Sequence, residues 1–122
     1  MSKMPVIAIV DDDGAIRTGL SSLLRSEGYQ IRLFESADAF LDSSCRAGID
    51  LVITDIQMDG TNGLDLQEIL KDRQPNLPML VMTAFPQPDL RSRALAQGAR
   101  CFMCKPFEAE ELLGCIRKAL TG

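Results

Sequence analysis

The chain has 122 residues, of which 46% are apolar and 25% charged, and its formal net charge is −4 at pH 7. This length and balance are typical of one globular domain with a single apolar core. The negative charge argues against direct binding of nucleic acid or anionic lipid, because phosphate contacts need clustered lysine and arginine. No apolar run approaches the roughly 20 residues of a membrane span. Residues 1–5 also lack the apolar centre of a signal peptide, so we expect a cytoplasmic location.

Five short apolar runs are predicted to form strands. Four of them are almost continuously apolar, which is typical of strands in a parallel sheet that is covered on both faces. The runs span residues 6–10, 31–34, 51–54, 79–82 and 101–104.

Segments with a helical pattern alternate with these strands. Apolar residues recur at amphipathic spacing over 16–24 and 112–120, and shorter helices are predicted over 37–45, 63–73 and 88–97. Ser36 is a plausible N-cap, and Pro88 is suited to the first helical position. Five strand–helix units predict a three-layer α/β sandwich with right-handed crossovers, formed by one domain over residues 1–122.

Glycines mark where several of these helices are expected to end. Gly28, Gly48 and Gly98 each follow a helical segment. The left-handed conformation that commonly closes a helix favours glycine, so these positions support the predicted boundaries.

Polar residues stand at the carboxyl ends of four predicted strands. In an open parallel sheet these ends lie on one edge, where ligands bind. Each residue has a simpler explanation by itself, because aspartate caps helices and turns, threonine favours strands and most lysines are solvated. Their joint placement favours a shared functional pocket. The residues are Asp11, Asp12, Asp55, Thr83 and Lys105.

This arrangement resembles the receiver domain of bacterial two-component response regulators over 6–120. The motifs that carry the resemblance are Asp11-Asp12-Asp13, Asp55, Thr83-Ala84 and Lys105-Pro106. The resemblance implies a doubly wound, flavodoxin-like fold with parallel strand order 2-1-3-4-5. Residues 28–41 look most like the FixJ branch, in which a receiver precedes a helix-turn-helix DNA-binding domain.

The resemblance also implies a role for each acid. Asp55 would be the phosphoacceptor, Asp12 a direct metal ligand, and Asp11 a ligand acting through water. The backbone carbonyl of Gln57 would complete a set of oxygen ligands suited to Mg²⁺. Crowded carboxylates repel one another, so a bound cation would also relieve their mutual repulsion.

Lys105 and Thr83 complete the implied reaction centre. Lys105 would neutralise the phosphoryl oxygens, and a cis peptide before Pro106 would aim it inward. Thr83 matches the switch threonine, whose hydroxyl moves to bond the phosphoryl group. Phe102 matches the switch aromatic, with an ordinary core phenylalanine as an equally plausible interpretation.

One position departs from the usual receiver pattern. Receivers often read Asp-x-x-Met-Pro-x-x-x-Gly after the third strand, whereas here Asp59 replaces the proline before Gly60. Asp-Gly readily forms a turn, so we expect the loop to be preserved. The additional carboxylate is expected to influence the choice of metal or phosphodonor.

The implied function is a signalling switch with Asp55 as the phosphoacceptor and a sensor histidine kinase as the phosphodonor. The domain would catalyse its own phosphorylation and dephosphorylation without acting as an enzyme on other substrates, and would control an output such as transcription. It would also form a homodimer through the face containing residues 88–97, 101–104 and 112–120. Two alternatives are a receiver-like interaction module without phosphotransfer and a hydrolase that passes through an aspartyl phosphate.

The four cysteines admit another interpretation. Cys101 and Cys104 have the C-x-x-C spacing of metal and redox sites. They lie on a predicted strand, where alternation sends the two sulfur atoms to opposite faces. With no histidine in the chain, free thiols are expected at these positions as well as at Cys45 and Cys115.

Overall fold

A computed structural model describes residues 4–42, 48–58, 60–85 and 87–121. Within these ranges, five strands form one parallel sheet in the order β2-β1-β3-β4-β5, which confirms the expected topology. The strands are β1 Val6–Val10, β2 Gln30–Phe34, β3 Leu51–Asp55, β4 Met79–Thr83 and β5 Cys101–Cys104. Three of them are one residue longer than predicted, and in β3 and β4 the additional residue is a proposed site residue.

In the described part of the chain, five helices connect or follow the strands, close to their predicted positions. They are α1 Gly14–Ser26, α2 Ala37–Asp42, α3 Gly63–Arg73, α4 Pro88–Ala96 and α5 Ala109–Thr121. The predicted end of the second helix, including Cys45, lies outside the described residues. Within the described ranges, no helix combines the length and apolar character needed to cross a bilayer.

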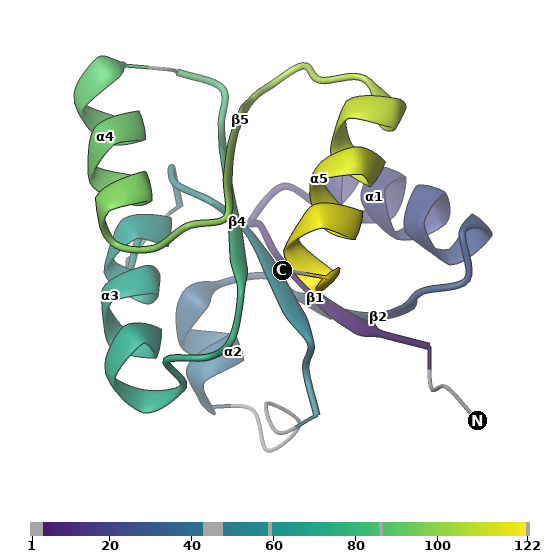
Figure 1. The fold of residues 1–122 in the computed structure, drawn as a ribbon, viewed down its shortest axis with the longest axis horizontal. Coiled ribbons are helices and arrows are strands. Elements are labelled where there is room, and N and C mark those ends of the chain that lie inside the picture. Colours follow the sequence, from purple (N-terminus) through teal and green to yellow (C-terminus); the bar gives the residue numbers. More distant parts are fainter. Residues whose placement is uncertain (1–3, 43–47, 59, 86, 122) are drawn as a thin grey trace.

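The helices cover both faces of the sheet, as a doubly wound fold requires. Helices α1 and α5 pack on one face, and α2, α3 and α4 pack on the other (Figure 1). Along β1, Ile7 and Ile9 contribute to the core beneath α1 and α5, whereas Ala8 and Val10 face the opposite core. This alternation follows from the two-residue period of a strand. Full burial of an aliphatic side chain contributes about 1.5–3 kcal/mol to folding, so both cores hold the sheet between the layers.

Local signals for helix boundaries are confirmed where they are described. Ser36 Oγ accepts a hydrogen bond from the Ala39 amide at 3.0 Å, and Pro88 begins α4. Gly28, Gly48 and Gly98 adopt φ values of 94°, 92° and 101°. These left-handed conformations explain why glycine occupies the three positions. They confirm the helix ends predicted before Gly28 and Gly98, whereas the helix end predicted before Gly48 lies outside the described residues.

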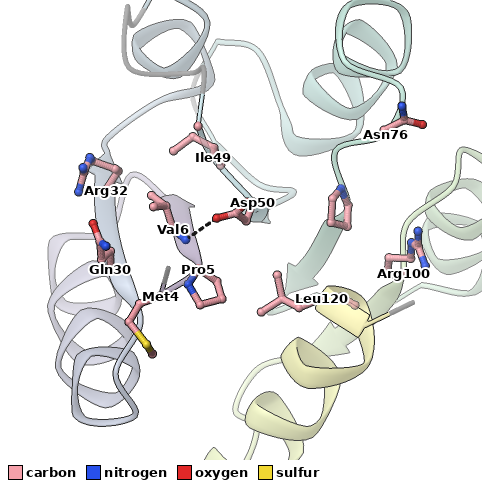
Figure 2. A pocket seen from close by; sticks show the side chains of 13 residues that line it. Met4, Pro5, Val6, Gln30, Arg32, Ile49, Asp50, Asn76, Arg100 and Leu120 are labelled. Atoms are coloured by element: carbon pink, nitrogen blue, oxygen red, sulfur yellow. Dashed lines mark hydrogen bonds between the residues drawn. The ribbon is translucent and has the colours of Figure 1, made fainter. Parts of the chain in front are cut away.

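A cavity of about 770 Å³ opens at the amino-terminal edge of the sheet, opposite the predicted site (Figure 2). Its wall includes Val6, the first residue of β1, whose amide donates a 2.8 Å hydrogen bond to Asp50 Oδ2. Arg32 and Arg100 also line the cavity. The polar residues predicted to react line none of it, so its size does not identify the functional site.

Candidate functional site at the carboxyl edge of the sheet

Asp11 is fixed immediately after β1 by bonds to both of its carboxylate oxygens. Oδ1 accepts a 2.9 Å hydrogen bond from the Asp13 amide, and Oδ2 lies 3.1 Å from Lys105 Nζ. The side chain is fully buried. These contacts hold a carboxylate where ionic partners stabilise it despite the desolvation cost of burial.

Asp55 ends β3 and combines burial with an unpartnered oxygen. Its Oδ2 lies 3.3 Å from Lys105 Nζ, whereas Oδ1 is buried and has no hydrogen-bond partner within the described part of the chain. An unpaired buried polar atom costs about 1–3 kcal/mol of stability and therefore calls for an explanation. Oδ1 is available to form a bond with a bound group.

The environment of Asp55 also disfavours its ionised form. Burial raises the pKa of the Asp55 carboxyl, the Lys105 charge lowers it, and the Asp11 charge raises it; together they leave the pKa above its ordinary value. A cation near the free oxygen would oppose this shift by stabilising the carboxylate.

Asp12 completes a cluster of three acids from two strand ends. One carboxylate oxygen from each of Asp11, Asp12 and Asp55 lies within 4.8 Å of the other two. Asp12 is exposed, whereas the other two are buried, so the cluster extends from the interior to the surface. Carboxylate oxygens and the free Asp55 Oδ1 suit a hard divalent cation such as Mg²⁺, which also retains water ligands. The donor set therefore fits the cofactor implied by the sequence.

Lys105 joins the ends of β1 and β3 from the end of β5. It is partly buried and lies within ion-pair distance of Asp11 and Asp55. The peptide to Pro106 is cis, as the sequence resemblance implied. These contacts overturn the simpler interpretation of Lys105 as a solvated surface residue.

Thr83 ends β4 and is held by two neighbours. Its Oγ1 donates a 2.6 Å hydrogen bond to Gln57 Oε1 and accepts a 3.0 Å bond from the Phe85 amide. The threonine is fully buried, whereas the Phe85 side chain is 67% exposed. The Thr83 hydroxyl is thus hydrogen-bonded to both Gln57 and the Phe85 amide, which a role in strand formation alone does not require.

Phe102 lies on the face of β5 that packs toward α3 and α4. The ring is partly buried against a cluster that includes Val81, Leu64 and Ala94. This position is compatible with either a switch aromatic or an ordinary core residue.

A solvent-accessible hollow of about 500 Å³ adjoins the acid cluster. It combines polar and apolar groups around an exposed site acid. Its lining residues are Asp12, Ile56, Gln57, Met58 and Asn62. The hollow therefore opens to solvent beside Asp12.

Two supporting residues were not assigned these roles from sequence. Asp13 caps α1 by accepting hydrogen bonds from the Ala15 and Ile16 amides at 2.9 and 3.3 Å. Its position before Gly14 gives a local capping signal. Gly63 instead permits close approach to the Asp55 backbone, because a Cβ at Gly63 would overlap the carbonyl of Asp55. No local sequence pattern signals this need for glycine at position 63, because the contact is with a residue of the preceding strand.

The C-x-x-C pair does not form a disulfide. Cys101 and Cys104 are free thiols; Cys101 packs toward α1 and α5, whereas Cys104 is exposed. Burial raises the pKa of Cys101 to about 11, with further contributions from a hydrogen bond and charge interaction with Cys115. The expectation of a free thiol is also confirmed for Cys115.

Comparison with known proteins identifies the family and supports the fold. Residues 7–117 match the family described as "Response regulator receiver domain". The chain is 40% identical over 115 residues to the response regulator protein TodT of Pseudomonas putida F1, covering 94% of this chain and 51% of TodT. It is 37% identical over 114 residues to the transcriptional regulatory protein FixJ of Bradyrhizobium diazoefficiens, covering 93% of this chain and 56% of FixJ. These values do not single out the FixJ branch.

A solved structure gives the same architectural result. The Vibrio cholerae chemotaxis protein CheY4 matches with a TM-score of 0.89 and 26% identity over 97% of this chain and 100% of CheY4. The chain spans about half the length of TodT and FixJ. The family match, parallel-sheet topology and acid pocket establish that this chain belongs to the receiver-domain family of two-component response regulators.

Proposed function

We propose that Asp55 accepts a phosphoryl group from the phosphohistidine of a sensor histidine kinase. A carboxylate oxygen of Asp55 forms the new oxygen–phosphorus bond while the phosphorus–nitrogen bond breaks and its electron pair returns to the imidazole. The observation that carries this proposal is the buried Oδ1, which has no partner among the residues that the structure describes, beside the lysine-bound Oδ2. The product is an aspartyl phosphate, and attack by water would regenerate Asp55 and release inorganic phosphate.

Neighbouring residues would position the group and stabilise its charge. Lys105 would donate to phosphoryl oxygens, and Thr83 would donate its hydroxyl proton to the bound group. Asp11, Asp12, Asp55 and the Gln57 backbone carbonyl would hold Mg²⁺. When bound, Mg²⁺ would supply charge neutralisation for phosphoryl transfer.

We also propose that residues 1–122 form one receiver domain in the cytoplasm, where it catalyses its own phosphorylation and dephosphorylation. The proposed output is control of transcription through another part of a longer protein. This output is supported by the similarity to FixJ, whose name describes a transcriptional regulator.

The acceptor assignment is tested by measuring intact mass after incubation with acetyl phosphate. We expect one added phosphoryl group with Mg²⁺ and no addition with excess chelator. Asp55→Asn should abolish labelling, whereas Asp72→Asn, on the exposed surface of α3, should retain it. Undiminished labelling of Asp55→Asn would reject the acceptor assignment.

The same experiment separates the alternatives. No labelling of the wild-type protein would favour an interaction module without phosphotransfer. Continued release of many equivalents of phosphate, with little labelled protein, would favour a hydrolase.

A homodimer is proposed through the face formed by α4, β5 and α5. Leu95 is 40% exposed on α4. Exposed charged residues on or next to these elements are Arg91, Arg93, Arg100, Glu108, Glu110 and Glu111. Opposite charges across a two-fold interface would stabilise and orient the dimer.

Sedimentation with Mg²⁺, with and without beryllofluoride, tests this dimer. We expect beryllofluoride to increase the dimer fraction and Arg91→Glu to reduce it. The reversed-charge pair Arg91→Glu/Glu111→Arg provides a test of complementarity. A monomer under both conditions would reject phosphorylation-linked dimerisation.

A further inference from the structure

The bond between Gln57 and Thr83 has a consequence for the proposed switch. The 2.6 Å contact uses the single hydroxyl proton of Thr83, with Gln57 Oε1 as its acceptor. A phosphoryl oxygen that receives this proton must therefore take the place of Gln57 as the acceptor.

We infer that the Gln57 side chain is a positioning residue that holds the Thr83 hydroxyl in the resting state and must release it on phosphorylation. This inference rests on the proposed function. It assigns to the amide side chain of Gln57 a role separate from that of its backbone carbonyl. The free-energy cost of breaking the bond would oppose activation in the absence of a phosphoryl group.

Several contacts define the resting arrangement. Thr83 is fully buried, so water does not readily replace Gln57 as its partner. The Phe85 amide donates to the same hydroxyl oxygen at 3.0 Å. Gln57 joins the segment after β3 to the end of β4, and the Phe85 bond joins the hydroxyl to the segment that leads to α4.

The Phe85 amide also provides a reporter for the switch. Movement of the Thr83 hydroxyl changes the environment of the Phe85 amide, which donates a hydrogen bond to it, even if the Phe85 side chain stays exposed. The amide resonance of Phe85 should therefore differ between the resting protein and the form bound to Mg²⁺ and beryllofluoride. Release of the hydroxyl by mutation should move the resting resonance toward the bound position.

Gln57→Met tests whether the Gln57 side chain holds the Thr83 hydroxyl, because methionine has similar length but lacks the amide acceptor. Thr83→Val removes the hydroxyl while retaining a β-branched side chain. Wild type, the two single variants and the double variant form a double-mutant cycle. Beryllofluoride affinity is measured at fixed Mg²⁺ by ¹⁹F NMR, alongside the Phe85 amide resonance and thermal unfolding.

We expect Gln57→Met to tighten beryllofluoride binding by about threefold to tenfold, as expected for loss of one competing hydrogen bond. The Phe85 resonance should move toward its bound position. Neither change should occur when Gln57→Met is made in the Thr83→Val background. Gln57→Glu retains an acceptor and should restore a wild-type-like Phe85 resonance.

Unfolding provides a measure of the bond that does not require a phosphate mimic. The decrease in melting temperature of the double variant should be smaller than the sum of the decreases in the two single variants, because each single variant already breaks the same hydrogen bond. If the decreases in melting temperature are additive, the hydrogen bond between Thr83 and Gln57 is rejected. Unchanged or weaker beryllofluoride binding by Gln57→Met would reject the proposal that Gln57 opposes activation. Failure of all four proteins to bind beryllofluoride, together with absence of Asp55 labelling by acetyl phosphate, would instead reject the proposed function.

Discussion

Lys105 Nζ lies 3.1 Å from Asp11 Oδ2, although the two residues are 94 positions apart in the chain. The same nitrogen lies 3.3 Å from Asp55 Oδ2. Burial lowers the pKa of Lys105, but its hydrogen bond and charge interaction with Asp11 and the charge of Asp55 raise the net pKa above its ordinary value. The lysine is therefore a cation shared between the ends of β1 and β3.

Lys105→Met should slow phosphorylation of Asp55 by about 100-fold or more, comparable to removal of a donor that stabilises transition-state charge. The variant retains an unbranched apolar side chain but cannot neutralise the phosphoryl oxygens. Rates of mass increase with acetyl phosphate and Mg²⁺ measure this effect. Lys118→Met, on the exposed surface of α5, provides a control that should react at the wild-type rate. Equal rates for Lys105→Met and wild type would contradict the assigned role.

Asp55→Asn should increase the melting temperature at pH 7 in excess chelator. The folded pKa of Asp55 is raised by burial and, to a smaller extent, by Asp11, against the opposing Lys105 charge, so its ionised form destabilises the folded state. Unfolding followed by circular dichroism measures the difference. A lower melting temperature for Asp55→Asn would show that the lost contact with Lys105 outweighs relief of the buried charge.

The stability difference should also depend on pH. Between the unfolded and folded pKa values, the folded state holds a proton that the unfolded chain has lost, so wild-type stability falls as pH rises through the folded pKa. The advantage of Asp55→Asn should therefore shrink as pH falls toward the ordinary Asp pKa of 3.8. Asp72→Asn provides an exposed-acid control at each pH. A constant Asp55→Asn advantage would contradict this linkage.

Gly63→Ala should destabilise the fold by about 1–3 kcal/mol or more, because its added Cβ would overlap the backbone of Asp55. Relief of this overlap would displace Asp55 and also slow its phosphorylation. Gly19→Ala is a helical control, because apart from the adjoining chain and helix backbone no described heavy atom lies within 4 Å of the added Cβ. It should stabilise the protein by about 0.5–1 kcal/mol. Denaturant unfolding measures the change in the free energy of unfolding for each variant, which should have opposite signs. Stabilisation by both substitutions would reject the close packing of Gly63 against Asp55.

Cys101 should react with iodoacetamide more slowly than Cys104 at pH 8. Cys101 is partly buried and its pKa is about 11, so little of it is the reactive thiolate, whereas the Cys104 side chain is exposed. Time-resolved peptide mass spectrometry measures both positions in one sample. Faster labelling of Cys101 would contradict the protected environment, while a guanidinium-unfolded sample should show a smaller difference in rate.

The sequence by itself determined the alternation of strands and helices, because periodicity and capping are local properties. It also identified Asp11, Asp55 and Lys105 as residues at strand ends. Their common position followed from the general geometry of a parallel sheet, while the receiver resemblance supplied the strand order and the proposed phosphoacceptor.

Only the tertiary structure decided which atoms meet. It paired Thr83 with Gln57, placed Gly63 against the Asp55 backbone, and left Asp55 Oδ1 without a partner among the described residues. These relationships depend on strand register, loop position and side-chain rotamer. Those variables join residues that are distant along the chain, so no local periodicity specifies them.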